Sequence, residues 1–384
     1  MHTLRHLKNG RALLLVVFCL LVAALPAAAQ STALVAFVNS SGQLVVSSGD
    51  GGFRWIITNP GEALAGDYRW SPDGSRLYFA VGTGGAASLR AAAVSQQSAG
   101  EIGQIPGQFV SISPDGSFVF YQNGDGSYAL LSTNAAAPPL NPVRNDLGAR
   151  YNGLWADVGS VVAYWGYASN SVLSVTDAAD GETVTLDSGR SAPITPLAWR
   201  PGTLQLIFRD AGGFIRLADL SCLQATCATN PLEAGIALAS ADADAATDGA
   251  WLFFRSGDTI AALNLACAPS DTCQSTPRVS VAANAAPQTG LYVAGNTLVY
   301  SAYSQNPNDP NDREVRRVDL ACLNGGACSP QTVASGAVAG AVSSDARFAV
   351  VETSGGLNAL DLSSGALAYL SDRGAPLAGA RWQP

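Results

Sequence analysis

The chain has 384 residues, of which 48% are hydrophobic and 13% are charged, and its formal net charge is −8. This composition excludes an intrinsically disordered protein, because disordered chains lack the apolar residues that form a core. The negative charge argues against nucleic acid and anionic membranes as partners, because phosphate binding needs a positively charged face.

The first 29 residues have the pattern of a secretory signal peptide. Arg5, Lys8 and Arg11 precede an apolar segment, 12–25. This segment is too short to span a membrane, which takes about 20 residues. Small residues at 27–29 form a cleavage pattern. We therefore expect residues 1–29 to be removed and 30–384 to form one domain that is secreted or periplasmic. An uncleaved N-terminal anchor is the alternative, and no later segment is long and apolar enough to span a membrane.

Cleavage would remove every histidine and lysine of the chain, His2, His6 and Lys8. The mature chain would keep 21 − 3 = 18 arginines and 29 acidic residues, so its formal charge would be −11. A catalytic triad or dyad with histidine, a histidine-ligated metal and a lysine Schiff base are then excluded. A carbohydrate-active enzyme that uses only carboxylates, Tyr and Arg is compatible with this inventory, but no two acids are paired by the sequence.

The rest of the chain is a series of short apolar runs separated by Gly, Asp, Asn and Pro, which is typical of an all-β protein. The motif WSPDGSRLYFA begins at Trp70 and recurs as ISPDGSFVFYQ from Ile112. Pro, Asp and Gly in this order favour a tight turn between two strands. Weaker copies of the motif begin at Trp155, Trp199, Ala245, Val293 and Val342.

A second signature confirms the period of the repeat. In five places a strand ends with Asp or Asn and enters a turn, at spacings of 42, 45, 55 and 42 residues. A period in the forties with about four short strands is typical of a β-propeller blade. The five positions are Asp177, Asp219, Asn264, Asp319 and Asp361.

Eight first-strand segments can be counted, which predicts an eight-bladed β-propeller; seven blades is the alternative if 236–300 is divided differently. The last segment, 380–384, has no strands after it. Three strands near the N-terminus, within 33–39, 43–48 and 53–59, would complete its blade. The two ends of the chain would then pair in one sheet and close the ring.

The WSPDG and ISPDG motifs resemble the blade motif of TolB-like and related WD-repeat-like propellers. The resemblance covers the repeats by pattern and two of them by close motif. It implies the fold, whereas propellers have many functions. TolB itself has a helical domain before the propeller, so its specific role is not carried over to this chain.

Six cysteines follow the predicted signal peptide, in three local pairs at the same turn of successive blades. In an exported protein this spacing predicts three disulfides rather than a metal site, because zinc needs four converging ligands. The pairs are Cys222 with Cys227, Cys267 with Cys273, and Cys322 with Cys328.

Loops on a rigid scaffold often carry function, and in a propeller the loops between second and third strands share one face. Exposed Tyr, Trp, Arg and Asn there would suit recognition of a protein or glycan, although Trp165 and Tyr303 could also be core residues at strand ends. The segment 306–312 is rich in oxygen ligands and could hold Ca²⁺. The candidate ligand-binding residues are Arg144, Trp165, Tyr167, Arg209, Asp210, Tyr303, Asn306, Asp309 and Asp312.

These observations favour an exported, monomeric propeller that binds a protein or glycan in the cell envelope without catalysis and without a cofactor. The carboxylate-dependent enzyme is the alternative function, and a purely structural envelope component is a third.

Overall fold

The computed structural model describes one compact unit within Ala33–Pro384. Its described residues are 33–82, 87–123, 127–133, 150–167, 171–190, 194–224, 236–240, 244–268, 273, 275–287, 289–304, 306 and 312–384. Within these ranges the side chains of 150–152, 166, 167, 171, 172, 187–190, 224 and 236–240 are not described.

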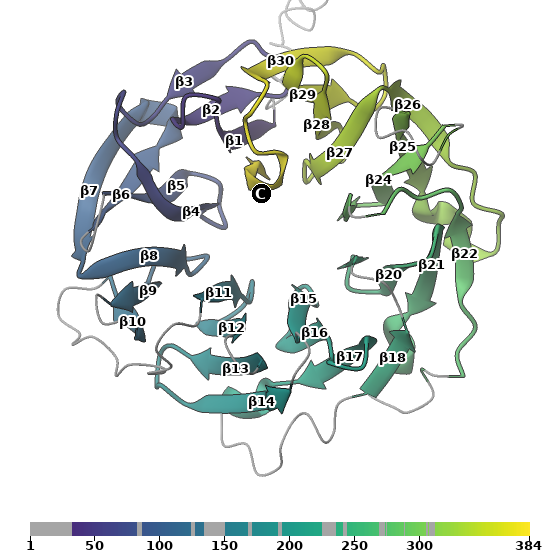
Figure 1. Ribbon diagram of the computed structural model, residues 1–384, viewed down its shortest axis with the longest axis horizontal. Coiled ribbons are helices and arrows are strands. Elements are labelled where there is room, and N and C mark those ends of the chain that lie inside the picture. Colours follow the sequence, from purple (N-terminus) through teal and green to yellow (C-terminus); the bar gives the residue numbers. More distant parts are fainter. Residues whose placement is uncertain are drawn as a thin grey trace, which may run out of the picture. The chain divides into compact units, whose positions relative to one another are not determined.

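Eight antiparallel sheets are arranged as blades in a ring (Figure 1). This confirms the eight-bladed prediction over the seven-bladed one. We call the side of the blades on which their first strands lie the channel side, as in other propellers. Blade 1 is formed by β31 (Arg381–Trp382), β1 (Leu34–Val38), β2 (Leu44–Ser48) and β3 (Arg54–Ile56). Blade 2 is formed by β4 (Leu64–Trp70), β5 (Arg76–Val81), β6 (Ala87–Ala93) and β7 (Ser98–Ile105). Blade 3 is formed by β8 (Gly107–Ile112), β9 (Phe118–Asn123) and β10 (Tyr128–Ser132).

The remaining blades each have four strands. Blade 4 contains β11 (Arg150–Trp155), β12 (Val161–Tyr167), β13 (Ser171–Asp177) and β14 (Thr183–Arg190). Blade 5 contains β15 (Thr195–Trp199), β16 (Gln205–Arg209), β17 (Phe214–Asp219) and β18 (Ile236–Ser240). Blade 6 contains β19 (Ala245–Thr247), β20 (Trp251–Ser256), β21 (Thr259–Asn264) and β22 (Val279–Ala282). Blade 7 contains β23 (Leu291–Ala294), β24 (Thr297–Tyr303), β25 (Arg313–Asp319) and β26 (Gln331–Ser335). Blade 8 contains β27 (Ala337–Val342), β28 (Phe348–Thr353), β29 (Gly356–Asp361) and β30 (Leu367–Asp372).

The helical segments are short 3-10 helices at strand ends. They are η1 (Val94–Gln96), η2 (Ser221–Gln224), η3 (Leu265–Cys267), η5 (Leu320–Asn324) and η6 (Leu377–Gly379). Within the residues that the structure describes, no helix is long and apolar enough to cross a membrane.

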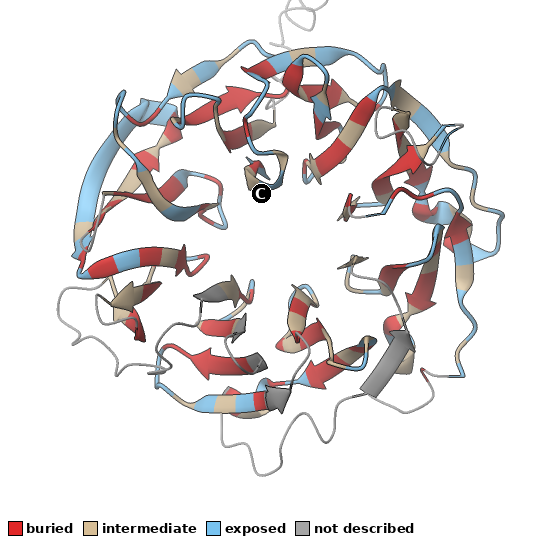
Figure 2. Ribbon diagram, viewed as in Figure 1, coloured by how far each residue is buried: buried red, intermediate tan, exposed pale blue. Residues whose placement is uncertain are grey.

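The core consists of apolar clusters between neighbouring blades. Figure 2 shows buried residues on the inner and middle strands, whereas an outer strand such as β7 is largely exposed. Between blades 8 and 1, Phe37 and Phe348 are buried in one cluster, and the rings of Phe348 and Trp382 stack with their centroids 6.0 Å apart. Side chains of alternate strand positions thus bury against the next blade, as the period of two requires.

Four first-strand tryptophans connect successive blades by hydrogen bonds. Each indole N–H donates to an acceptor on the first strand of the preceding blade, so the innermost strands are held at a fixed spacing. The bonds run from Trp70 to the Arg381 carbonyl (2.9 Å), from Trp155 to the Ser111 hydroxyl (3.1 Å), from Trp199 to the Leu154 carbonyl (2.9 Å) and from Trp382 to the Ala341 carbonyl (2.8 Å).

The end of the chain closes the ring as the sequence predicts. In β31, Trp382 pairs with Val35 of β1, and the Gln383 N–H donates to the Leu34 carbonyl at 2.8 Å. The side-chain amide of Gln383 also donates to the Gly74 carbonyl of blade 2, at 2.7 Å. Gly74 has φ +66°, and a Cβ there would lie 2.6 Å from the Gln383 side chain. Glycine is therefore required in this turn both by its backbone conformation and by the closing segment.

The Ser-Pro-Asp-Gly turns are fixed by a shared set of hydrogen bonds. In blade 2 the Ser71 hydroxyl donates to Asp73 at 2.6 Å, and the same carboxylate accepts the Ser75 N–H at 3.0 Å. Ser113 with Asp115 repeats the first of these contacts, and Ser343 with Asp345 repeats it in a turn of the sequence Ser-Ser-Asp-Ala. Such Asp turns give the backbone its partners locally.

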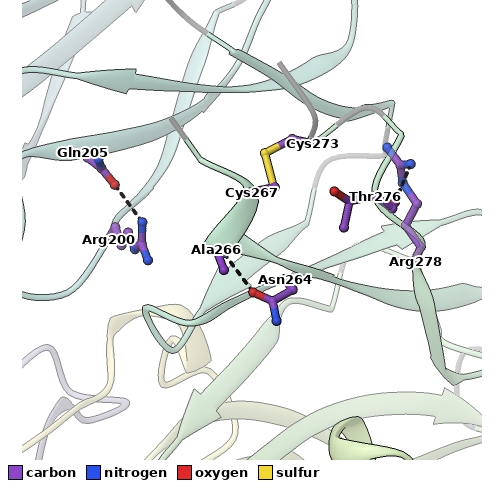
Figure 3. The surroundings of a disulfide bond; sticks show 8 residues. All are labelled: Arg200, Gln205, Asn264, Ala266, Cys267, Cys273, Thr276 and Arg278. Carbon is purple, nitrogen blue, oxygen red and sulfur yellow. Dashed lines mark hydrogen bonds between the residues drawn. A yellow bond between two sulfur atoms is a disulfide. The ribbon is translucent and has the colours of Figure 1, made fainter. Parts of the chain in front are cut away.

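Two of the predicted disulfides are present, Cys267–Cys273 and Cys322–Cys328, each with a Cα–Cα distance of 5.0 Å. Cys222 is also disulfide-bonded, while its predicted partner Cys227 lies outside the described residues. The Asn264 side chain accepts the Ala266 N–H at 2.8 Å and so caps η3 before Cys267 (Figure 3). The Asp/Asn signature of the sequence therefore marks the start of the disulfide hairpins in blades 6 and 7.

The first prediction concerns closure. Trp382 is 9% exposed, and we expect Trp382→Ala to lower the free energy of unfolding by about 3–5 kcal/mol, because a buried aromatic ring and its hydrogen bond are lost. Urea denaturation would measure this change. Tyr369→Ala is the control, since Tyr369 is 54% exposed on β30 and should change stability by less than about 0.5 kcal/mol. Equal effects of the two substitutions would contradict a closing role for Trp382.

The second prediction concerns acid stability. Hydrogen bonds from Ser71 and Ser75 lower the pKa of Asp73 to about 2. Burial alone would raise the pKa of Asp361, but hydrogen bonds from Ser363 and Ser364 outweigh it and bring that pKa also to about 2. The pKa of an Asp in the unfolded chain is about 3.9. These turns therefore stabilise the fold above about pH 4, and their contribution to stability is lost as the pH falls towards 2.

Urea denaturation at several pH values between 5 and 2 would test this expectation. The variant Asp73→Asn should lose less stability over this pH interval than the wild type, because one of the titrating groups is gone. Identical pH profiles for the two proteins would show that the Asp73 turn does not contribute.

Candidate functional site

A cavity of about 1140 Å³ opens on the channel side of blades 2, 3 and 4 and the closing strand. Its wall comes from the first strands β4, β8, β11 and β31, together with residues of β9, β10 and β12. The lining residues are Gly66, Asp67, Tyr68, Arg69, Trp70, Gln108, Phe109, Val110, Gln122, Tyr128, Gly153, Leu154, Trp165, Arg381, Trp382 and Pro384.

The positions of Asp67 and Arg69 in this wall follow from the alternation of side chains between the two faces of β4. Tyr68 and Trp70 are each 4% exposed and belong to the core between blades 1 and 2. Asp67 and Arg69 occupy the alternate positions, so their side chains lie on the other face of the strand, towards the channel. Two large aromatic anchors therefore determine where the two charges are placed.

Arg69 is half-buried and has no hydrogen bond or ion pair with any residue in the described ranges. Burial lowers the pKa of Arg69 below its usual value, and the nearby Asp67 carboxylate offsets this effect in part. Arg381 acts in the same direction as burial, because its positive charge repels that of Arg69. A half-buried guanidinium without a partner lowers the stability of the fold. Such a loss of stability is typical of a residue that is used for binding.

Asp67 does not neutralise this site. Its carboxylate lies 3.8 Å from the Arg381 guanidinium, with both side chains more than 40% exposed, and such an ion pair is weak. Arg381 also donates to the carbonyls of Ala378 and Ala380 at 2.8 and 3.2 Å. Among the described side chains that line the cavity, Arg69 and Arg381 are positively charged and Asp67 is negatively charged.

One of the predicted ligand-binding residues, Trp165, lines this cavity. Its side chain is half-buried and packs against the cluster between blades 4 and 5. Unlike the indoles that connect the blades, its N–H has no hydrogen-bond partner in the described part of the chain. Gln108 adds an exposed amide on β8. The cavity therefore offers hydrogen-bond donors from an arginine, a tryptophan and a glutamine.

The other described candidates of the loop face lie on blades 5 and 7. Arg209 is half-buried at the end of β16. Asp210 accepts the N–H groups of Gly212 and Phe214 at 2.8 and 3.0 Å and an Arg216 N–H at 2.5 Å. Burial alone would raise the pKa of Asp210, but these bonds outweigh it and lower the pKa. The carboxylate of Asp210 thus holds the β16–β17 turn.

Tyr303 is half-buried at the end of β24, where its N–H donates to the Asn284 carbonyl at 3.0 Å. Asp312 accepts a hydrogen bond from the Ser304 hydroxyl at 2.5 Å and another from the Asn306 N–H. The Asp312 carboxylate therefore already has partners inside its own loop.

Some predictions fall outside the described residues. These are the positions of Arg144 and Asp309 and the side chain of Tyr167. In the described ranges no group of three or more His, Cys, Asp or Glu side chains is arranged to hold a metal ion. Because Asp309 is not covered, the predicted Ca²⁺ site at 306–312 stays a prediction.

Sequence reasoning missed Asp67, Arg69 and Arg381. The signal was present in Gly66–Trp70 and at Arg381-Trp382, where a charged residue precedes a buried tryptophan. Once the tryptophans are assigned to the core, the period of two places these charges towards the channel. Asp67 is the single acid among the described lining residues, so the carboxylate pair of a glycosidase is not found in that set.

No protein-family model matches this chain, and no curated protein matches it in sequence. Solved structures do resemble it. The dihydro-heme d1 dehydrogenase NirN has a TM-score of 0.58 at 14% identity, over 91% of this chain and 75% of that one. A eukaryotic initiation factor has a TM-score of 0.53 at 11% identity, over 93% of this chain and 99% of that one.

TolB from Acinetobacter baumannii is also among the matches, with a TM-score of 0.40 at 9% identity, over 92% of this chain and 67% of that one. The similarities to NirN and to the initiation factor establish the fold alone. A dehydrogenase and an initiation factor share the architecture, so the function must be argued from this chain's own site.

The third prediction separates Arg69 from a structural arginine. We expect Arg69→Met to leave the free energy of unfolding unchanged or to raise it by up to about 1 kcal/mol, because an unpaired half-buried charge is removed. Arg255 pairs with Asp244 at 2.7 Å, with side chains 5% and 18% exposed. Arg255→Met should therefore cost about 3 kcal/mol, because it leaves Asp244 without its partner.

Urea denaturation of both variants beside the wild type would measure these changes. A loss of stability in Arg69→Met as large as that in Arg255→Met would show that Arg69 has a structural role.

Proposed function

We propose that this chain is an exported, non-catalytic propeller that binds a protein or glycan partner in the cell envelope through the mouth of its central channel. One observation carries the proposal: the cavity presents donors of Arg69 and Trp165 that have no partner in the described residues. Groups of this kind are typical of a binding site, because an unpaired polar group is costly unless a ligand satisfies it.

The location outside the cytoplasm rests on two features. Residues 1–29 have the pattern of a signal peptide, and local disulfides follow successive blades. Disulfides of this kind persist in oxidising compartments. We expect the protein in the periplasm or outside the cell.

The absence of catalysis is proposed from the side chains available to the site. The mature chain would lack histidine and lysine, and Asp67 is the one acid among the described cavity residues. General acid–base chemistry needs a positioned pair of proton donor and acceptor. Arginine, tryptophan and glutamine bind and orient a ligand but supply no such pair.

A pull-down would test this function. Exported protein is immobilised and incubated with the solubilised envelope and the secreted fraction of its own source, with and without Ca²⁺. We expect a partner that is retained by the wild type and at least tenfold depleted with Trp165→Leu, because the cavity loses one aromatic side chain together with its indole donor. The matched control is Trp55→Leu, a half-buried tryptophan on the outer strand β3.

A partner lost equally with both tryptophan variants would place binding elsewhere or indicate general damage, which urea denaturation would reveal. If the wild-type protein retains no partner in the pull-down, the binding function is contradicted.

A further inference from the structure

We propose that the cavity beside Arg69 binds the carboxylate group of an acidic saccharide chain. This inference rests on the proposed function, since it names the class of ligand for the same site. It follows from the charge of the cavity, the geometry of its donors and the charge of the whole chain.

The first step is the unpaired guanidinium. Arg69 is half-buried on β4 and makes no hydrogen bond or ion pair with any described residue. The carboxylates of Asp67 and Asp157 act on Arg69, but neither forms an ion pair with it, and Asp67 lies 3.8 Å from Arg381 instead. A desolvated positive charge of this kind attracts an anion strongly, because less water screens it than at an open surface.

The second step is the shape of the donor. A guanidinium presents N–H groups in a planar fork that matches the two oxygens of a carboxylate. Arg381 lies close enough to Arg69 to repel it, and an anion between them would relieve this repulsion. Asp67 on the same strand would repel an anion that approached from its side, which fixes the side from which the ligand carboxylate must enter.

The third step selects a saccharide. Trp165 and the exposed Gln108 line the same cavity as Arg69. An aromatic face can pack against the apolar face of a sugar ring, while indole and amide groups hydrogen-bond to its hydroxyls. The cavity volume of about 1140 Å³ is above the range of about 300–1,000 Å³ for small-molecule sites. We therefore expect several linked sugars rather than one.

A folded protein partner fits this cavity less well. Stable protein interfaces bury about 800 Å² on each partner over a broad contact surface. The donors described here instead line a concave site between the first strands of three blades and the closing strand. A narrow chain can enter such a site, whereas a broad protein surface would not reach Arg69.

The fourth step limits the charge of the ligand. The full chain carries a formal charge of −8, so a dense polyanion is repelled by the protein as a whole. The described side chains of the cavity supply only two positive charges, Arg69 and Arg381, beside the Asp67 carboxylate. We therefore expect isolated carboxylates separated by neutral sugars, as in a chain with one sialic or uronic acid among several neutral units.

An oligosaccharide array would test the inference. It contains neutral chains, chains of the same length with one sialic or uronic acid, densely uronated chains, and chains with one phosphate or sulfate. The protein is applied at physiological ionic strength, and the best acidic member is then measured by calorimetry. We expect the singly carboxylated chains to bind at least tenfold more tightly than their neutral counterparts.

Arginine variants separate charge from geometry. Arg69→Met should weaken binding of the acidic chain at least tenfold and leave the weak binding of the neutral chain unchanged. Arg69→Lys should restore part of the affinity, because it retains the charge without the planar fork. The control is Arg90→Met. Arg90 of blade 2 pairs with Glu62 at a distance of 3.0 Å and is not among the residues that line the cavity. This variant should bind like the wild type.

Three results would overturn the inference: no carboxylated chain binds better than its neutral counterpart, only phosphorylated or sulfated chains bind, or Arg69→Met binds as well as the wild type. If an envelope partner is still retained in the pull-down in these cases, the proposed function stands and only the ligand class is wrong. If neither assay gives binding, both proposals fail.

Discussion

The hydrogen bonds between first-strand tryptophans and the preceding blade are the constraint on which the site depends. Trp70 donates from β4 of blade 2 to β31 of blade 1, and Trp382 donates from β31 to β27 of blade 8, so β4 and β31 are each held to the preceding blade. Because each tryptophan is buried on one face of its strand, the residue before it must lie on the channel face. The same interaction that holds the ring together thus places Arg69 and Arg381 towards the channel.

Much of the fold could be predicted because it repeats. The repeated first-strand segments gave the number of blades and the closing strand. The spacing of the cysteines gave the two disulfides that the structure shows, Cys267–Cys273 and Cys322–Cys328. Each of these features is local: a turn, a capped strand end or a hairpin depends on a few neighbouring residues. Closure could be inferred because Arg381-Trp382 is an incomplete unit of the same repeat.

The site was less predictable, because it is formed by residues far apart in the sequence. Trp165 was selected for its loop and does line the cavity, but Arg69 and Arg381 were not selected. The importance of Arg69 depends on the partners that it lacks, and the sequence does not show this. Asp210 and Asp312 illustrate the opposite case, since both are polar loop residues whose carboxylates hold their own turns.

Ring closure also has a consequence for the order of folding. The hydrogen bond between Trp70 and the Arg381 carbonyl joins residues 311 positions apart, whereas most strand pairs are hairpins formed by near neighbours. Contacts of long sequence separation form slowly, because the loop entropy is lost before the contact contributes. Individual blades can therefore form before the ring is complete, and the ring is completed only when β31 pairs with β1. Until then β1 has an open edge, and an unfinished ring would be the species most exposed to pairing with another chain and to proteases.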